Sequence, residues 1–324
     1  MTERLSAAAV QLPSSTSNLG SGYDTLGLAL NRYLVASFEP GGNALECVWD
    51  GTLANLEVTD NDNLLVGAFT RIFNQEGLIP CGVLRATSDI PISRGLGSSA
   101  AAVLAGYDLA RAVLNKPRDD KGAFVEAHRQ DGHGENAAAC LHGGLCAVVH
   151  HPNNPIIVPL KLSSRVGFAY VAPSKGISTR KARRVLPKEV GHEVAVRSLG
   201  RITALVQGFA RGDPELIRIG VEDELHVPYR LSLIDSAEEA IAAGYEAGAW
   251  AVTISGAGSG IVAMCDLENT EAISDAMCVV LSRATGESNC LSFSAAPDHV
   301  GLRRLSYGSS FKYSRSTLAQ PGAR

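Results

Sequence analysis

The sequence predicts an α+β protein with two domains. The chain has 324 residues, enough for one large domain or for two of ordinary size. Strand-like apolar runs and helix-like runs both occur along its length. A new strand-like run at residues 166–171 follows a turn-rich break, so we place the domain boundary before it, near residue 160. The expected division is residues 1–160, residues 161–306 and a polar tail at 307–324.

Composition and charge exclude several classes of protein. Hydrophobic residues make up 45% of the chain and charged residues 19%, which is typical of a globular protein with an ample core. The net charge is -4, and no Lys/Arg cluster is long enough to indicate nucleic-acid binding. No apolar run approaches the roughly eighteen residues that a membrane span needs. The seven cysteines contain no Cys-x-x-Cys pair and the N-terminus has no signal-peptide core, so we expect a cytoplasmic protein with reduced thiols.

The most informative stretch is residues 91–102, Pro-Ile-Ser-Arg-Gly-Leu-Gly-Ser-Ser-Ala-Ala-Ala, which leads from a strand-like run into a helix-like run at 99–114. Gly95 and Gly97 allow positive φ angles and a close approach to a ligand. The two serines that follow supply hydroxyls where the helix begins. Because a helix start has unpaired N–H groups and the positive end of the dipole, it suits phosphate. The alternative is a tight strand-to-helix turn that binds no ligand.

Two common nucleotide-binding motifs do not fit this stretch. It is not a P-loop, because no Gly-Lys-Ser/Thr follows the first glycine at the required spacing. It is not the dinucleotide fingerprint of Rossmann oxidoreductases, because the third glycine and an acidic residue closing a second strand are both missing.

The N-terminal part begins with a strand-like run at residues 5–12, stopped by Pro13. We expect a loop at residues 14–24, because small polar residues and glycines dominate there. This segment places Asn18 and Asp24 six residues apart, and an amide with a carboxylate suits an amine or hydroxyl substrate. A simple connection without a ligand is the alternative.

Further strand-like runs follow at residues 26–30 and 34–38, and the glycines at 41–43 indicate a hairpin-type turn. Residues 60–63 are typical of a helix cap, and the helical spacing after them predicts a helix that ends near Gly77.

A second polar constellation lies at residues 131–144, where Asp131, His133 and Glu135 fall within five residues. Asn136 comes next and begins a helix of small residues. The alternative interpretation is a polar loop in which Glu135 or Asn136 merely caps that helix.

The C-terminal part opens with a basic segment at residues 179–187, Thr-Arg-Lys-Ala-Arg-Arg-Val-Leu-Pro. It is either a solvated helix face or an anion grip in which an arginine binds a carboxylate or phosphate with two hydrogen bonds. An amphipathic helix is predicted at 194–210 and closed at 212–214, followed by helical regions at 222–230 and 237–247.

The pattern of residues 251–264 predicts a strand, a glycine loop and a second strand. The loop is either a tight hairpin alone or a second glycine loop beside a nucleotide or substrate. A helix at 270–281 and a strand at 290–294 complete the prediction. The loop residues are Ser255, Gly256, Ala257 and Gly258.

Three of these segments resemble the GHMP kinases in the same order: the early loop, the stretch from Pro91, and the late glycine loop. Within that family the chain is most similar to the homoserine kinase branch. Its early Ser-Asn-Leu-Gly-Ser-Gly-Tyr-Asp-Thr-Leu-Gly is close to the branch's Ser-Ala-Asn-Leu-Gly-Pro-Gly-Phe-Asp-Ser-Leu-Gly. Residues 131–136, 179–187 and 226–230 resemble its Glu-Gly-His-Pro-Asp-Asn, Thr-x-x-Ala-Arg-x-x-Leu-Pro and His-x-Pro-Tyr-Arg.

This resemblance implies the two-domain GHMP kinase fold, with an N-terminal domain like domain 2 of ribosomal protein S5 and a C-terminal ferredoxin-like α/β sandwich. It implies Mg²⁺- and ATP-dependent phosphorylation of the L-homoserine hydroxyl to O-phospho-L-homoserine, in threonine biosynthesis. The implied partners are small molecules, with no nucleic acid and no membrane, and a homodimer is left open. The alternatives are a GHMP kinase of the mevalonate or sugar type and a catalytically silent relative that binds ligand.

Carried over by position, the resemblance implies that Asp24 meets the substrate ammonium and that Arg183 and Arg230 meet its carboxylate. Asn136 and His133 would act as the catalytic pair. The substrate-binding set is Asn18, Asp24, His133, Asn136, Arg183 and Arg230. The ATP-binding set is Asn63, Pro91, Ile92, Ser93, Arg94, Gly95, Leu96, Gly97, Ser98, Ser99, Ala100 and Ala101. The metal-binding set is Ser99 and Asp131.

The chain departs from the family pattern at several of these positions. Asp131 stands where the family has glutamate, and Glu135 stands where it has aspartate, so the two side chains nearly exchange lengths. Gly134 replaces a proline, and residues 259–260 replace Pro-Thr in the late loop. No Asp-Lys pair presents itself as a base, so we expect substrate fixation to dominate over proton abstraction by a side chain.

Overall fold

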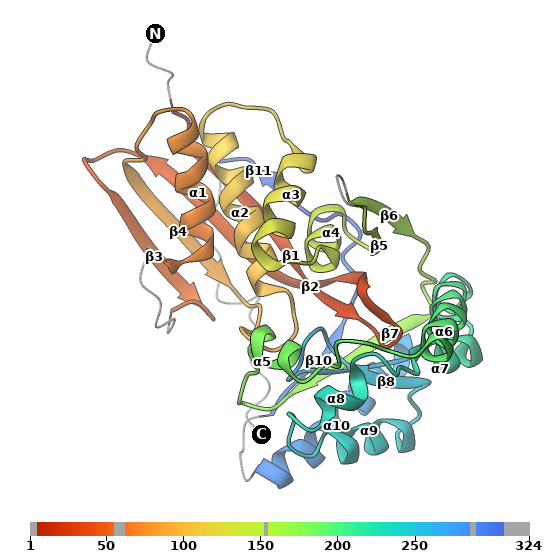
Figure 1. Ribbon diagram of the computed structural model, residues 1–324. Coiled ribbons are helices and arrows are strands. Elements are labelled where there is room, and N and C mark those ends of the chain that lie inside the picture. The colour runs from red at the N-terminus through yellow and green to blue at the C-terminus, as the bar shows by residue number, and fades with distance from the viewer. Residues whose placement is uncertain (1–4, 55–61, 152–154, 286–289, 308–324) are drawn as a thin grey trace.

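The computed structural model describes residues 5–54, 62–151, 155–285 and 290–307 (Figure 1). Within them the strands form a seven-stranded sheet, with the main order β11-β1-β2-β4-β3 and with β5 and β6 extending from β2, and a four-stranded sheet, β10-β7-β9-β8. The first contains β1 (Ala8–Asn18), β2 (Gly22–Pro40), β3 (Leu45–Gly51), β4 (Gly82–Ser88), β5 (Leu145–Val149), β6 (Ile156–Leu160) and β11 (Arg303–Leu305). The second contains β7 (Val166–Ala172), β8 (Ala251–Ile254), β9 (Ile261–Asp266) and β10 (Leu291–Ala295).

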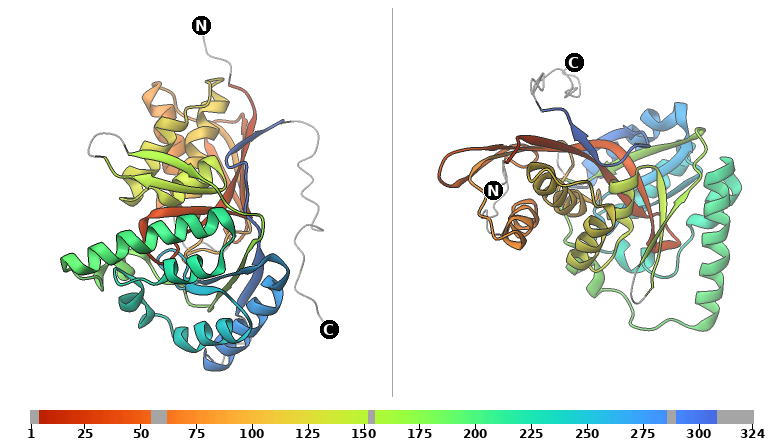
Figure 2. Two further views of the ribbon diagram at one scale, coloured as in Figure 1. Left: turned by 90° about the vertical axis from the view of Figure 1, so that its right-hand side faces the viewer. Right: turned by 90° about the horizontal axis from the view of Figure 1, so that it is seen from above.

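Helices cover one face of the long strands of the first sheet, as the view from above shows (Figure 2). The aromatic rings of Phe38, Phe69 and Phe73 pack between β2 and α1 with centroids 4.9–6.2 Å apart. Burial of such rings supplies much of the free energy that holds a helix on a sheet. The helices of this part are α1 (Leu64–Gln75), α2 (Ser98–Val113), α3 (Asp120–Asp131) and α4 (Glu135–His142).

The second sheet is buried on both faces, and β7 makes this clear. Its Phe168 belongs to the apolar cluster that extends into the first sheet and contacts Phe209, with ring centroids 6.2 Å apart. Its Ala169 and Val171 point into a separate cluster under α9 and α10. A strand buried on both faces carries apolar residues without alternation, as β7 does. The helices of this part are α5 (Thr179–Arg184), α6 (His192–Arg211), α7 (Pro214–Val221), α8 (Val227–Leu231), α9 (Ala237–Glu246) and α10 (Thr270–Thr285).

The predicted α+β class is confirmed, and so are most of the predicted elements. Asn63 caps α1, its side chain accepting hydrogen bonds from the N–H groups of Leu65 and Val66 at 3.0 and 3.4 Å. The stretch after β4 leads directly into α2, and Gly97 is the N-cap residue of that helix. Residues 251–264 form the predicted hairpin of β8 and β9.

The loop expected at residues 14–24 is wrong except at residues 19–21, because residues 14–18 belong to β1 and residues 22–24 to β2. Strand β1 continues to Asn18 and pairs with β2 throughout, and the chain turns only at residues 19–21. Composition misled the prediction, because Ser14 to Ser17 are polar yet at most 1% exposed. Their backbone groups are satisfied by the sheet, and their hydroxyls by buried partners that the sequence does not reveal.

The hairpin expected at residues 41–43 is also wrong, because β2 and β3 do not pair. Strand β4 lies between them, antiparallel to β2 and parallel to β3. Three further elements, β6, α7 and β11, were not predicted. Each is short, and a short apolar segment carries little periodic signal.

The domain division at residue 160 stays a prediction. The last strand of the first sheet ends at Leu160, and β7 opens the second at Val166. Strand β11 returns to the first sheet, where Leu305 pairs with Ala9. The predicted polar tail, from residue 308 on, lies outside the described residues. No helix in the described chain combines the length and the apolar character needed to cross a bilayer.

Gly27 on β2 offers a test of how closely α4 is packed. A Cβ atom there would lie 2.1 Å from the backbone oxygen of Glu135, so Gly27→Ala forces the start of α4 away from the sheet. We expect the free energy of unfolding to fall by about 1–3 kcal/mol, measured by urea denaturation.

The control for that variant is Gly200→Ala, in the middle of α6, where a Cβ atom would have nothing within 4 Å. We expect this change to raise stability by about 0.5–1 kcal/mol, because alanine favours a helix interior. Equal effects of the two substitutions would contradict the packing argument.

Candidate active site

The turn before α2 is built on two glycines with positive φ, 72° at Gly95 and 64° at Gly97. A Cβ atom at Gly95 would lie 1.9 Å from the backbone oxygen of Ser255, and one at Gly97 would lie 2.1 Å from Ser15 Oγ. Only glycine fits either position without moving the backbone. The turn is therefore pressed between β1 and the late glycine loop.

The late glycine loop, residues 255–258, contacts the other two glycine-rich segments. Ser255 Oγ donates a hydrogen bond to the backbone oxygen of Gly95 at 2.7 Å. The N–H of Gly256 donates to the backbone oxygen of Ser17 at 3.0 Å. Three segments far apart in the sequence thus meet at the start of α2.

Two cavities open at this point. The polar one has a volume of about 400 Å³, and the apolar one a volume of about 220 Å³. Both are lined by Ser93, Ser98 and Ser99, so the N-terminus of α2 lies between them. Others lining the polar cavity are Ser17, Asn18, Asp24, Gly95, Leu96, Gly97, Gln130, Asp131, His133, Glu135, Asn136, Ile177, Thr179, Arg180, Arg183, Arg230, Gly256, Ala257 and Gly258. Others lining the apolar cavity are Leu34, Trp49, Leu53, Asp62, Asn63, Leu64, Leu65, Ser88, Ile90, Ile92 and Ala102.

The two predicted metal ligands are in direct contact. Ser99 Oγ, in the first turn of α2, lies 2.9 and 3.1 Å from the carboxylate oxygens of Asp131 at the end of α3. Burial raises the pKa of Asp131, partly offset by the hydrogen bond from Ser99. A hydroxyl beside a carboxylate that has lost solvent is the kind of oxygen pair that Mg²⁺ accepts.

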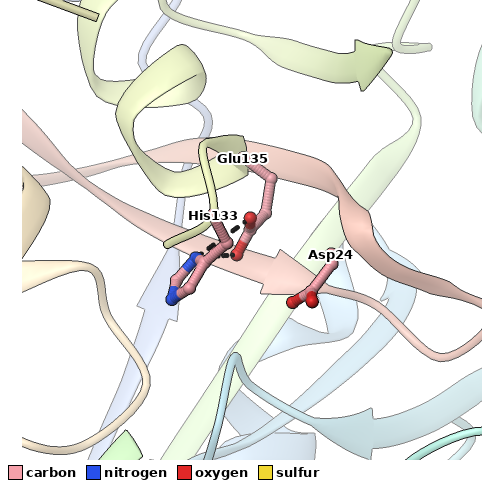
Figure 3. A group of neighbouring side chains, drawn as sticks. All are labelled: Asp24, His133 and Glu135. Atoms are coloured by element: carbon pink, nitrogen blue, oxygen red, sulfur yellow. Dashed lines mark hydrogen bonds and ion pairs between the residues drawn. The ribbon is translucent and has the colours of Figure 1, made fainter. Parts of the chain in front are cut away.

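His133 and Glu135 form a buried ion pair before and at the start of α4 (Figure 3). His133 Nδ1 lies 3.0 and 3.1 Å from the two Glu135 carboxylate oxygens. Burial alone would lower the pKa of His133, but the hydrogen bond and the charge of Glu135 outweigh it and raise that pKa. Glu135 is 1% exposed, so its charge depends on these partners.

Asn136 is held on both sides of its amide. Its Nδ2 donates to Ser17 Oγ at 2.9 Å and to a Glu135 carboxylate oxygen at 3.0 Å, while its Oδ1 accepts from Ser15 Oγ at 2.8 Å. The alternative in which Glu135 or Asn136 caps the helix fails, because the N-cap is Gly134 and no side chain bonds there.

Asp24 and Arg183 bind each other across the polar cavity. Arg183 Nη2 lies 2.7 Å from Asp24 Oδ1, and Nη1 lies 3.1 Å from Oδ2. Two backbone contacts fix Asp24: its N–H donates to Asn18 Oδ1 at 2.9 Å, and its carbonyl accepts from His150 Nε2 at 2.8 Å. The basic segment is thus more than a solvated helix face, because Arg183 on α5 reaches the cavity.

Arg230 on α8 is 1% exposed yet lines the polar cavity. Its Nη1 donates to His226 Nδ1 at 3.2 Å and to the backbone oxygen of Gly256 at 3.3 Å. Burial lowers the pKa of His226 to about 4, so its ring is neutral near pH 7. With the proton on Nε2, His226 donates to the backbone oxygen of Gly20 at 3.0 Å and leaves Nδ1 free to accept from the guanidinium.

Asp24 on β2 lies close to His133 and Glu135, which belong to one segment at the start of α4 (Figure 3). Their ligand atoms all lie within 4.8 Å of one another. Each already has a partner, Arg183 for Asp24 and the ion pair for the other two. The cavity thus contains a second group of acidic and imidazole side chains beside the Ser99 and Asp131 pair.

Sequence reasoning missed several residues of the site. Tyr23 and His226 lie inside the motifs that carried the resemblance, but they received no role. Ser15 and Ser17 lie two residues apart on β1, so both point to the same face of the strand, toward Asn136. This alternation was not recognised because residues 14–24 were interpreted as a loop. The rest of the apolar cavity was missed as well, because residues such as Leu34, Trp49 and Leu53 lie outside the motif at residues 91–102.

The chain is similar to known proteins over most of its length. Residues 63–144 match the family model of the GHMP kinases N terminal domain, and residues 205–281 match that of the GHMP kinases C terminal. Homoserine kinase from Parasynechococcus marenigrum is 37% identical over 273 residues, covering 83% of this chain and 87% of that protein. Homoserine kinase from Prochlorococcus marinus is 35% identical and covers 83% and 86% of the two chains.

Solved structures share the fold. The crystal structure of homoserine kinase from Cytophaga hutchinsonii superposes with a TM-score of 0.79 at 24% identity, over 92% of this chain and 97% of that one. Mevalonate kinase of L. major gives a TM-score of 0.65 at 13% identity, over 92% and 96% of the two chains. The two matched domain models, together with a relative 37% identical over most of the sequence, show that the chain belongs to the GHMP kinases.

Proposed function

We propose that the protein transfers the γ-phosphoryl group of ATP to the hydroxyl of L-homoserine, giving O-phospho-L-homoserine for threonine biosynthesis. One observation carries the proposal: the start of α2 lies between an apolar cavity and a cavity that holds Asp24, Arg183 and Arg230. The similarity to homoserine kinases at 35–37% identity supports this acceptor over a mevalonate or a sugar.

The apolar cavity suits a nucleotide base, and the turn beside it suits the phosphates. Asn63, a member of the expected ATP-binding set, lines the apolar cavity. The free N–H groups at the start of α2 and the positive end of its dipole attract phosphate oxygens. The glycines that precede the helix let the backbone approach those oxygens closely.

The residues present fit Mg²⁺. Ser99 and Asp131 offer hard oxygen ligands at the boundary of the two cavities, where the phosphates would lie. When bound there with ATP, Mg²⁺ neutralises charge that develops on the phosphoryl group. Asp131 is the stronger candidate, because Glu135 is engaged by both His133 and Asn136.

The polar cavity suits an amino acid that carries both charges. Asp24 matches an ammonium, and the two arginines match a carboxylate. Asp24 and Arg183 bind each other in the protein alone. A zwitterionic ligand replaces this ion pair by two ion pairs between protein and ligand, one with Asp24 and one with Arg183. A ligand with a single charge leaves one of the two protein charges without a partner, which costs binding free energy.

In this proposal, most of the rate enhancement comes from the positioning of the acceptor hydroxyl. The three carboxylates that line the polar cavity already hold partners: Asp24 with Arg183, Glu135 with His133, and Asp131 with Ser99. None is free to act as a base, and no lysine is among the described residues that line the cavity. Asn136 and His133 would then orient the acceptor hydroxyl toward the γ-phosphorus, in line with the leaving oxygen.

We also propose a cytoplasmic setting for this reaction. All seven cysteines lie among the described residues and carry free thiols, which suits a reducing compartment. A homodimer remains a prediction.

The proposed substrate is tested by ADP release with homoserine, mevalonate, shikimate and galactose as acceptors. We expect kcat/KM for homoserine to exceed that for each other acceptor by at least about 100-fold, because the others leave buried charges unpaired. If the enzyme prefers another of these acceptors, homoserine is not its substrate and the preferred acceptor takes its place in the proposal. ATP binding without turnover of any acceptor would support the catalytically silent relative.

Asn136→Ala and His133→Ala test the positioning roles. We expect kcat to fall by about 10- to 100-fold in each variant, because the acceptor hydroxyl loses a fixed hydrogen-bonding group. Asn31→Ala is the matched control, since Asn31 lies on β2 and binds the N–H of Ala296 outside the cavity. Activity near wild type in both cavity variants would remove their assigned roles.

Asp131→Asn and Glu135→Gln separate the two metal candidates. We expect Asp131→Asn to raise the Mg²⁺ concentration for half-maximal activity by about 10-fold or more, because it removes a charged ligand. Titration calorimetry of ATP with and without Mg²⁺ checks the same change by binding alone. If Glu135→Gln shifts the Mg²⁺ dependence and Asp131→Asn does not, the assignment reverses.

A further inference from the structure

Tyr23 lies on β2 immediately before Asp24 and contacts both arginines of the polar cavity. Its hydroxyl oxygen accepts a hydrogen bond from Arg183 Nη1 at 3.1 Å. The guanidinium carbon of Arg183 lies 5.9 Å from the centre of its ring, and that of Arg230 lies 5.2 Å away. The π faces of a tyrosine attract cations at these distances.

The ring of Tyr23 is itself held in place. It stacks on the neutral ring of His226, with centroids 5.0 Å apart and planes inclined by 26°. His226 in turn accepts from Arg230 and donates to the backbone of Gly20. Among the described residues, Tyr23 is thus the ring that contacts both Arg183 and the buried pair of His226 and Arg230.

The two arginines repel each other. Burial, and to a smaller extent the positive charge of Arg183, lower the pKa of Arg230. Asp24 compensates part of that charge by binding both Nη atoms of Arg183. In the described part of the chain, the hydroxyl of Tyr23 is the only other side-chain group to which Arg183 donates a hydrogen bond.

This arrangement has a consequence when substrate binds as proposed above. The substrate ammonium competes for Asp24, and Arg183 then loses the partner that fixes its guanidinium. Arg183 must stay in place to bind the substrate carboxylate with two hydrogen bonds. The hydroxyl of Tyr23 is the group that remains to hold it.

We propose that Tyr23 is a positioning residue for substrate recognition, which keeps Arg183 directed at the substrate carboxylate while Asp24 exchanges Arg183 for the ammonium. This inference rests on the proposed function. The hydroxyl binds Arg183 and the ring stacks on His226, so a phenylalanine at this position keeps the ring and loses only the hydroxyl. The effect of the hydroxyl is therefore separable from that of the ring.

Tyr23→Phe tests the hydroxyl. We expect KM for homoserine to rise by about fivefold to tenfold, with kcat within about twofold and KM for ATP unchanged, because a hydrogen bond to a charged group is lost. Tyr33→Phe is the matched control, since Tyr33 donates its hydroxyl to Asp298 outside the cavity. Tyr23→Leu removes the ring as well, and we expect a larger rise in KM.

A ligand without a carboxylate separates positioning from general damage. We expect 3-aminopropan-1-ol, measured as a competitive inhibitor, to bind wild type and Tyr23→Phe equally, because it makes no demand on Arg183. If Tyr23→Phe weakens the binding of homoserine and of 3-aminopropan-1-ol equally, the inference is wrong. It is also wrong if KM for homoserine is unchanged in Tyr23→Phe. Neither result affects the proposed function. A wild-type protein that does not phosphorylate homoserine overturns both.

Discussion

The close backbone approach at Gly95 is the constraint on which the site depends. Three segments meet there, and the hydrogen bond from Ser255 to the carbonyl of Gly95 locks the late loop of the second sheet onto the turn before α2. A side chain at Gly95 would collide with the backbone of Ser255. Because both sheets contribute to this contact, the cavities on either side of α2 keep their shape only if the two sheets stay together.

Charges in the polar cavity are paired before any substrate arrives. Asp24 binds Arg183, Glu135 binds His133, and Asp131 accepts from Ser99. Pairing lowers the cost of removing these groups from water, and that cost is greatest for Glu135, which is 1% exposed. Pairing also lets the cavity discriminate between ligands. Only a ligand that offers a new partner to both residues of an ion pair avoids leaving one of their charges without a partner.

Local signals in the sequence predicted the glycine turn, the capped helices and the strands that are apolar throughout. Gly95 and Gly97 were predicted correctly because positive φ has a chemical requirement that glycine meets. The path of β1 was not predicted, because burial of four consecutive polar residues depends on partners from distant segments such as Asn136 and Ser255. The position of β4 between β2 and β3 is likewise a long-range pairing that no local pattern encodes.

The exchange of carboxylate lengths at positions 131 and 135 has a geometric explanation. Asp131 closes α3 close enough to α2 that the shorter side chain reaches Ser99 at 2.9 Å. Glu135 opens α4 in the lining of the polar cavity, and its longer side chain spans to His133 and to Asn136 at the same time. Each carboxylate therefore has the length that its own helix end requires. Asp131 and Glu135 therefore hold different partners, so the two departures from the family pattern concern two separate hydrogen-bonding groups of the same cavity.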